Sequence, residues 1–406
     1  MSTIESIPAE AGASLLHADT PPRNLLSRPA TRHRGTQIDG ATLAPEGLWV
    51  RDKNLNELIG TMSFEAALAH LWFDREPSAQ EEAGIRTRLA ELSRVIARGT
   101  PAERAAAAMG AEGVEMVFAA ATGFLRGLDD VLAAWPDIPL QEADPDFEQT
   151  LACVAAAPFL MRAALEGRAG AVAHTSEDDH ARRMLTLTGA SRQDAIAGQV
   201  MNALLIAWHA GFGYITPTVL APRVAIGTGV TLTQAIAAGF MSSGPSHVGA
   251  ALEAMRWLQR LRAGVATDEH DALHRAGAAA VDRTLDASGA LLSGFGHPLF
   301  VEDPRPPHLR ALFTTWGFDG PHLALFDACC ERARERKGLN PNIDFLTAAA
   351  MLDLGVTEPR WGVGVGLCSR IAAMAAHAVE RRQRPAFGVN SATARKLHAA
   401  VPVGWL

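Results

Sequence analysis

The sequence predicts an all-α protein on three observations. Apolar residues recur at helical spacing in nearly every segment after residue 60. Alternating apolar and polar runs bounded by hairpin turn residues are scarce. Ala and Gly are abundant, and such small residues allow helices to pack closely. We therefore expect a many-layered helical protein rather than a simple bundle.

The expected elements follow in chain order. A short β-ribbon is expected at 36–51, the only stretch with plausible strands. The first helix is expected at 63–73, where Ser63 is an N-cap and Phe64 and Leu68 share one face. The same apolar spacing predicts further helices at 150–165, 192–210, 231–240, 249–261, 268–287, 307–316, 323–337, 344–354 and 360–381.

Length and composition limit the functional classes. A chain of 406 residues favours two lobes, or one large domain with an inserted subdomain. The net charge of -7, with dispersed basic residues, argues against nucleic acid as a partner. Apolar stretches such as 204–208 are much shorter than the roughly 20 residues of a membrane span, so no membrane association is expected. Residues 1–35 are expected to form a disordered or partner-wrapping arm.

The cysteines lack the spacing of a zinc site or a redox pair, so no metal is expected there. We interpret them as reduced thiols of a cytoplasmic protein: Cys153, Cys329, Cys330 and Cys368. A second cluster, His174, Asp178, Asp179 and His180, has metal-ligand residue types but is better explained as a polar loop before a helix. The glycines at 362–366 do not have GxGxxG spacing and no strand precedes them, which favours close helix packing over dinucleotide binding.

Four loops combine Gly or Pro with a titratable residue: 208–213, 244–249, 293–298 and 340–345. This pairing is typical of places where backbone approaches a ligand while a side chain does acid or base chemistry. Two of the loops open a helix, where free N–H groups favour bound anions. Each signal alone is weak, because a histidine between glycines is commonly a turn residue and an Asp that opens a helix is commonly a cap.

Together and in this order, these motifs resemble the active-site series of the citrate synthase superfamily: His209, Gly-Pro-Ser-His247, Gly-Phe-Gly-His297, Asp-Pro-Arg305, Pro-Asn-Ile-Asp344, Ser-Arg370 and Gln-Arg384-Pro. Upstream, the runs LWVR, ELIG and SFE resemble the N-terminal region of that family. The resemblance covers about residues 35–390. It implies a citrate synthase-like fold with a large helical domain of residues 1–246 plus 351–406 and a smaller inserted helical domain of residues 247–350.

The resemblance also implies roles. Deprotonation of an acyl-CoA requires a base near a weak carbon acid and a donor at the thioester oxygen. Asp344 would be the base, His247 the donor, and His297 the group that polarises the ketone of an oxo-acid. The carboxylates of that substrate would be bound by His209, Arg305, Arg370 and Arg384, with Arg384 contributed across the interface of a homodimer.

Coenzyme A would enter as a substrate thioester, with no permanently bound cofactor. By resemblance, Gly294, Phe295 and Gly296 would lie near the adenine and Lys337 near the phosphates. An equally good interpretation of the basic residues at 332–337 is a solvated helix end.

The expected reaction condenses acetyl-CoA with oxaloacetate to citrate and CoA. Citryl-CoA cleavage and a 2-methylcitrate-type condensation with propionyl-CoA remain alternatives. An alternative of another class is a non-catalytic CoA-binding regulatory subunit, although the presence of both histidines and the aspartate argues against it. Departures from the family pattern fall at Trp208 and Ala210, where the family has "DHE", and at 298–300. They affect the identity of the oxo-acid more than the type of reaction.

Overall fold

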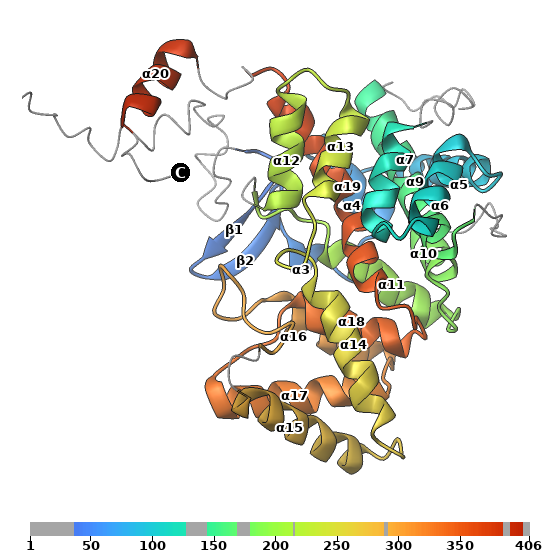
Figure 1. The fold of residues 1–406 in the computed structure, drawn as a ribbon, viewed down its shortest axis with the longest axis vertical. Coiled ribbons are helices and arrows are strands. Elements are labelled where there is room, and N and C mark those ends of the chain that lie inside the picture. Colours follow the sequence, from blue (N-terminus) through green and yellow to red (C-terminus); the bar gives the residue numbers. More distant parts are fainter. Residues whose placement is uncertain are drawn as a thin grey trace, which may run out of the picture.

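The computed structural model describes residues 36–126, 144–168, 179–213, 216–287, 291–384 and 390–400. The described chain is mainly helical, which confirms the predicted fold class (Figure 1). The predicted ribbon is confirmed as an antiparallel sheet of order β1-β2-β3, with the strands Asp39–Leu43, Glu46–Val50 and Lys53–Asn54. The expected arm at residues 1–35 lies outside the described residues.

The helices before the second glycine-rich loop are α3 (Leu55–Leu58), α4 (Phe64–Phe73), α5 (Ala79–Ile96), α6 (Pro101–Ala111), α7 (Met116–Leu125), α9 (Pro145–Glu166), α10 (His180–Thr188), α11 (Ala195–Ala207), α12 (Pro217–Ile226) and α13 (Leu232–Met241). Those after it are α14 (Ala250–Ala263), α15 (His270–Asp286), α16 (Arg305–Trp316), α17 (Pro321–Lys337), α18 (Ile343–Asp353), α19 (Trp361–Arg381) and α20 (Ser391–Ala400). Each helix expected from the apolar spacing is present, with ends shifted by a few residues.

Polar caps set several of the helix starts. The Ser63 side chain accepts from the N–H of Ala66, as expected from the sequence. Ser78 and Glu81 form a reciprocal capping box at the start of α5. Asn342 caps α18, and its side chain accepts from the N–H of Asp344. The last of these caps fixes the backbone beneath a predicted catalytic residue.

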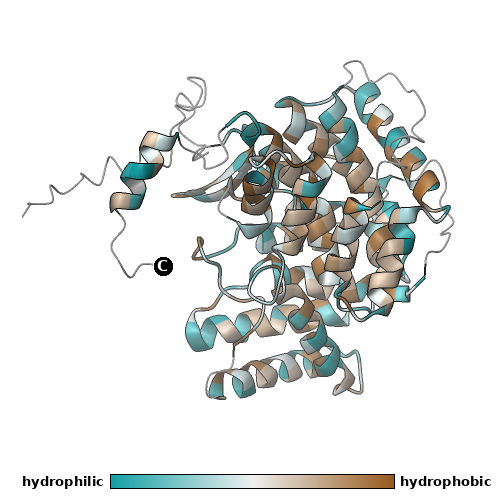
Figure 2. Ribbon diagram, turned by 45° about the horizontal axis from the view of Figure 1, so that its top comes forward, coloured by the Kyte–Doolittle hydropathy of each residue, from teal (hydrophilic) through white to brown (hydrophobic). Residues whose placement is uncertain are grey.

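Helix α19 runs through the core and packs on α9, α12, α13 and α14. Its glycines allow this approach, since a Cβ on Gly362 would lie 3.1 Å from the Ala251 backbone on α14 and one on Gly364 would lie 3.2 Å from Sδ of Met161 on α9. The prediction that the 362–366 glycines serve helix packing is therefore confirmed. Figure 2 shows hydrophobic colour concentrated in the interior helices and hydrophilic colour along outer faces and helix ends.

By length and composition alone, α19 is apolar enough to cross a membrane, contrary to our expectation that apolar runs are too short. However, 89% of its apolar window is buried inside the molecule. Burial of this kind is typical of a central core helix. It makes α19 weak evidence for a membrane span.

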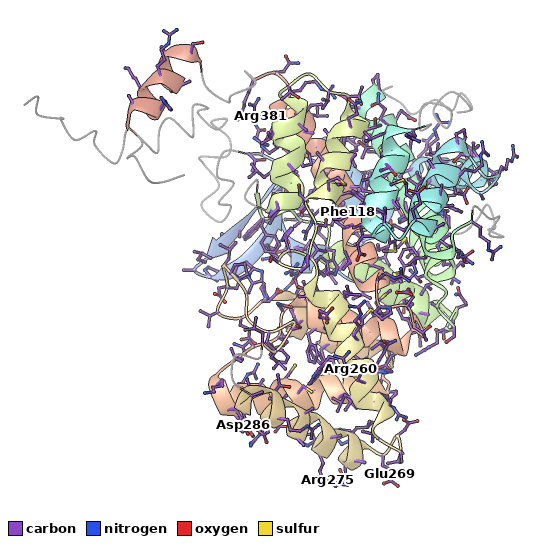
Figure 3. The ribbon with its side chains drawn as sticks, viewed as in Figure 1. Phe118, Arg260, Glu269, Arg275, Asp286 and Arg381 are labelled. Atoms are coloured by element: carbon purple, nitrogen blue, oxygen red, sulfur yellow. The ribbon has the colours of Figure 1, made fainter. Side chains whose placement is uncertain are left out.

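Helices α14, α15, α17 and α18 form a lower group in which α15 packs along α17 and α14 along α18 (Figure 1). Charged side chains such as Glu269 and Arg275 lie at the outer edge of this group (Figure 3). Except for the last turn of α18, the lower group falls within the predicted inserted domain, whose boundaries at 247 and 350 remain a prediction. The lower group meets α11 and α19, and residues of all four predicted chemical loops line one cavity.

Candidate active site

A cavity of about 360 Å³ brings together residues from the four predicted loops. All three predicted catalytic side chains line it, together with two of the predicted carboxylate-binding arginines: His247, His297, Asp344, Arg305 and Arg370. Aromatic and aliphatic side chains form much of the remaining wall, including Trp208, Phe212, Val248 and Leu299. The sequence separation of these residues shows that the fold builds the cavity from distant segments.

The loop that carries His247 is a tight backbone turn. The N–H of Gly244 donates to the carbonyl of His247 at 2.9 Å, and the reverse bond is 3.0 Å. Val248 has a φ of 70°, in the left-handed region that disfavours side chains. Gly249 lies against the same turn, because a Cβ there would lie 2.8 Å from the Gly244 oxygen. The turn thus fixes the backbone from which His247 reaches the cavity.

The tautomer of His247 follows from its neighbours. Its Nε2 lies 3.4 Å from the Thr218 hydroxyl, which lies 3.4 Å from Nη1 of Arg370. Since arginine only donates, the Thr218 oxygen accepts from Arg370, and its own proton is then available for Nε2 as acceptor. Burial, with Arg370 nearby, lowers the pKa of His247 to about 4, so the ring is neutral near pH 7. The remaining proton is then on Nδ1, which leaves Nδ1–H as a donor.

His297 has the opposite tautomer. The backbone N–H groups of Leu299 and Phe300 both donate to its Nδ1, at 3.1 and 3.2 Å. Burial lowers the pKa of His297 to about 4, which keeps the ring neutral. Phe300 stacks on the ring with centroids 4.7 Å apart and holds its plane. The proton therefore lies on Nε2, which is the free donor of this ring.

Asp344 lies in the first turn of α18 and is half-buried at the cavity wall. Its Oδ1 is buried and has no hydrogen-bond partner among the described residues. Burial raises the pKa of Asp344 to about 6, although the charges of Arg305 and Arg370 act in the opposite direction. A carboxylate with a raised pKa and a free oxygen suits proton abstraction.

The two cavity arginines have different surroundings. Arg305 is 2% exposed, and its Nε and Nη2 donate to both oxygens of Asp303 at 2.9 and 2.7 Å. Asp303 also accepts from the backbone N–H of Ile343 at 3.0 Å, which links this ion pair to the start of α18. Arg305 thus holds Asp303 against the start of α18, and it also faces the cavity.

Arg370 is 3% exposed, but no carboxylate among the described residues lies within ion-pair distance of it. Its polar contacts are the Trp208 carbonyl and the Thr218 hydroxyl, both at 3.4 Å, and its guanidinium lies 5.5 Å from the Trp208 ring centre. Burial lowers the pKa of Arg370 to about 10, so the group stays charged near pH 7. A buried cation without a counter-ion is costly unless an anion binds beside it.

His209 does not line the cavity. Its ring is fully buried, Nδ1 lies 3.2 Å from the Ser369 carbonyl, and the ring packs edge-on against Phe64. Trp208, the preceding residue, lines the cavity instead. A direct contact of His209 with substrate remains a prediction, and in this structure the ring holds α11 against α19.

The predicted CoA-binding residues do not line the cavity, although three of them lie in the loop that ends at His297. The N–H of Asn342 donates to the Gly294 carbonyl at 2.8 Å, and that of Gly296 donates to the Asn340 carbonyl at 2.9 Å. These bonds join the third and fourth loops, and the Phe295 ring packs on Phe345. Lys337 is exposed at the end of α17, and Arg384 lies just beyond α19, outside the cavity lining.

Sequence reasoning missed the residues that support the site. Asp39 is fully buried and accepts from the backbone N–H groups of Gly211 and Gly213 at 2.5 and 2.6 Å. Its Oδ1 also lies 3.1 Å from Nε2 of His377 on α19. A lone Asp in a ribbon gives no signal of this role. Thr218 was likewise missed, although it follows the motif that contains His209.

Of the polar cluster at 174–180, only Asp179 and His180 lie among the described residues. Asp179 caps α10, and His180 is buried and stacks on Phe64 with ring centroids 5.0 Å apart. His174 and Asp178 lie outside the described residues.

Comparison with known proteins gives the family. No curated protein matches the chain. The citrate synthase of Pyrobaculum aerophilum has a TM-score of 0.66 at 20% identity, covering 86% of this chain and 88% of that chain. The enzyme of Thermotoga maritima MSB8 has a TM-score of 0.61 at 16% identity, covering 85% and 88%.

A ternary complex of the Thermoplasma acidophilum citrate synthase with carboxymethyl coenzyme A and oxaloacetate has a TM-score of 0.62 at 16% identity, covering 86% of this chain and 89% of that chain. These likenesses show the fold. The family profile described as "Citrate synthase, C-terminal domain" matches residues 25–387, which is most of the chain. The chain therefore belongs to the citrate synthase family.

Proposed function

We propose that this protein joins the α-carbon of an acyl-CoA, with acetyl-CoA as the first candidate, to the ketone carbon of a 2-oxo acid. One observation carries the proposal. The carboxylate of Asp344, with a raised pKa and an unpartnered oxygen, shares a cavity with two neutral imidazoles that have opposite free N–H groups. Such a set of one base and two donors is what an enolate reaction requires.

In the first step Asp344 removes a proton from the α-carbon of the thioester. The C–H electron pair moves into the carbon–carbon bond of an enolate, and the negative charge develops on the thioester oxygen. His247 stabilises this oxygen through its Nδ1–H. A neutral donor is well suited here, because its proton stays on the ring while the hydrogen bond strengthens as charge develops.

In the second step the enolate carbon attacks the ketone carbon of the acceptor. The ketone oxygen gains the electron pair of its π bond and takes a proton, for which His297 Nε2–H is the assigned donor. Arg370 binds the acceptor carboxylate and so fixes the ketone in the orientation for attack. Water then cleaves the thioester, which gives a carboxylate and free CoA.

The same groups accelerate both directions, so cleavage of an acyl-CoA of the citryl-CoA type is the second candidate. Oxaloacetate is the acceptor that the resemblance implies, and the Thermoplasma acidophilum relative binds it together with a CoA analogue. Use of acetyl-CoA or propionyl-CoA depends on the acyl end of the cavity. We further propose that the protein acts as a homodimer, with Arg384 completing the partner's site.

The test is thiol release from acetyl-CoA and propionyl-CoA against a set of 2-oxo acids, with citryl-CoA cleavage as the reverse assay. Asp344→Asn is expected to lower kcat by about a thousandfold or more, since it keeps the shape but removes the base. The control is Asp327→Asn on α17, which breaks an ion pair with Arg310 outside the cavity. Comparable activity of Asp344→Asn and the wild type would refute the proposal. CoA binding without turnover by the wild type would favour the regulatory-subunit alternative.

A further inference from the structure

One carboxylate of the β-ribbon holds the loop that follows His297, an arrangement whose use rests on the proposed function. Glu46 is the first residue of β2 and pairs with Leu43 at the tip of the ribbon. Its Oε1 accepts from the N–H of Val301 at 2.7 Å, and its Oε2 accepts from the N–H of Glu302 at 3.1 Å. Hydrogen bonds to a carboxylate are stronger than those between neutral groups. Glu46 therefore joins the ribbon tip to the loop before α16 (Figure 1).

The two amides bound by Glu46 continue a series that begins at the imidazole. The N–H groups of Leu299 and Phe300 donate to Nδ1 of His297, so the four successive amides 299–302 meet two acceptors. Each peptide unit is planar, and only two soft torsions per residue join it to the next. A restraint on the amides of 301 and 302 therefore also limits where the amides of 299 and 300 can point.

The ribbon supports a second ring beside His297. Asp39, at the start of β1, accepts from the N–H groups of Gly211 and Gly213 at 2.5 and 2.6 Å. Between these glycines Phe212 has a φ of 61°, in the left-handed region, and its ring centre lies 5.4 Å from that of His297. The two ends of one ribbon thus hold two loops that meet at the same imidazole.

Packing alone holds the outer part of the His297 loop only weakly. Val301 is 84% exposed, so its side chain buries little surface. Its carbonyl accepts from Nδ2 of Asn340 at 3.1 Å, and Glu302 forms an ion pair with Arg334 at 3.2 Å. Both side chains of that pair are exposed, and surface pairs of this kind contribute little. Polar bonds therefore supply most of the restraint, and Glu46 accepts two of them.

We propose that Glu46 is a positioning residue for the ketone step, where it keeps Nδ1 of His297 bonded to the loop and the ring proton on Nε2. That proton then passes to the ketone oxygen as the new carbon–carbon bond forms. When the loop is released, Nδ1 can carry the proton instead and the ring can turn, so the donor no longer faces the ketone. Asp344 and His247 lie on other loops, and deprotonation of the acyl-CoA is expected to continue without Glu46.

The first test separates the two steps in full-length Glu46→Ala. Thiol release, with the 2-oxo acid that the wild type uses best, is expected to fall about tenfold or more because the donor is displaced. Exchange of the acetyl-CoA methyl hydrogens in deuterated solvent, with malate present, needs no ketone donor and is expected to stay within about twofold of the wild type. Unchanged thiol release, or an equal fall in both measurements, would overturn the inference. Absence of both activities from the wild type would instead refute the proposed function.

The second test uses a conservative variant, a control and a measurement that needs no turnover. Glu46→Gln keeps one acceptor oxygen and is expected to release thiol at a rate between those of Glu46→Ala and the wild type. The control is Glu81→Ala, which loses a 2.7 Å bond from the Ser78 N–H outside the cavity lining and is expected to change neither activity. Hydrogen exchange of the amides at 299–302 is expected to be about tenfold faster in Glu46→Ala, but not in Glu81→Ala. Equal exchange of these amides in Glu46→Ala and the wild type would contradict the role assigned to Glu46.

Discussion

Asp344 must lose a proton before it can act as a base, and burial controls the pH at which it does so. Burial raises its pKa to about 6, while His247 and His297, with pKa values lowered to about 4, are neutral above that range. We therefore predict that kcat/KM rises with pH along a single limb with its midpoint near 6. A pH–rate profile measures this. A midpoint near the ordinary Asp value of about 4 would contradict it.

The raised pKa also has a cost in stability. Below the unfolded pKa of Asp344 both states are protonated, whereas above about pH 6 the fold must hold the charged form, so stability falls as the pH rises through this interval. Asp344→Asn is thus expected to raise the free energy of unfolding by about 1–3 kcal/mol near pH 7.5 and by much less near pH 4. Denaturant unfolding at both pH values measures the difference. A loss of stability near pH 7.5 would show that the ionised carboxylate is well compensated.

At the residue scale, the sequence predicts which residues come together better than it predicts their tautomers. The order of the motifs was sufficient to select His247, His297 and Asp344, and the cavity contains all three. Their tautomers were not predictable, because they depend on Thr218 and on backbone N–H groups that come close only after folding. His209 was also selected by its place in the motif series. Its ring is nevertheless buried outside the cavity, which its position in the sequence could not show.

At the element scale, the N-terminus of α18 connects the loop at 293–298 with the loop at 340–345, which carry two of the candidate catalytic residues. Asn342 accepts from the N–H of Asp344 at 3.0 Å and donates to the Gly296 carbonyl at 2.8 Å. Asn342→Ala is predicted to cost about 1–2 kcal/mol of stability and to lower kcat/KM about tenfold or more, because it frees both loops.

The control for this prediction is Ser78→Ala, which removes the capping box of α5, an element that does not line the cavity. It is expected to cost about 1 kcal/mol with kcat/KM unchanged. Thermal unfolding and steady-state kinetics on both variants separate a lost cap from a misplaced base. Equal kinetic effects in the two variants would mean that Asn342 does not position the site.

Helix positions were predictable where apolar spacing was regular, but α5, α6, α7, α10 and α12 were not specified from the sequence. In α12 prolines obscured the pattern, because Pro217 begins the helix and Pro222 lies inside it. Helix α16 begins at Arg305, two residues before the expected start, since prolines in the first turn fit a helix whose early N–H groups are free. The ribbon was predicted as a structure, but its function in holding the 211–213 loop through Asp39 was not.

At the scale of the whole molecule, the prediction that Arg384 acts across a dimer interface is tested by mixing two inactive variants. In a heterodimer of Asp344→Asn and Arg384→Ala, one site has both an intact Asp344 and an intact Arg384 only if the arginine comes from the partner. Unfolding and refolding an equal mixture is expected to restore about a quarter of wild-type activity. No restoration, with heterodimers present, would show that each Arg384 serves its own subunit or none.

The fold at this scale was predictable because helical periodicity and the motif series agree over most of the chain. The central position of α19 was harder to predict, because its composition resembles that of a membrane span. Only its packing shows that it is a core helix.

The central claim is that Asp344, His247 and His297 form one site that deprotonates an acyl-CoA. Exchange of the methyl hydrogens of acetyl-CoA in deuterated solvent, followed by mass spectrometry with malate in place of the oxo acid, measures this step directly, because malate has no ketone and the enolate must take a deuteron back. Deuterium is expected to enter acetyl-CoA with the wild type, but not with Asp344→Asn. Neither exchange with malate nor thiol release with oxaloacetate by the wild type, or equal incorporation by Asp344→Asn, would contradict the claim.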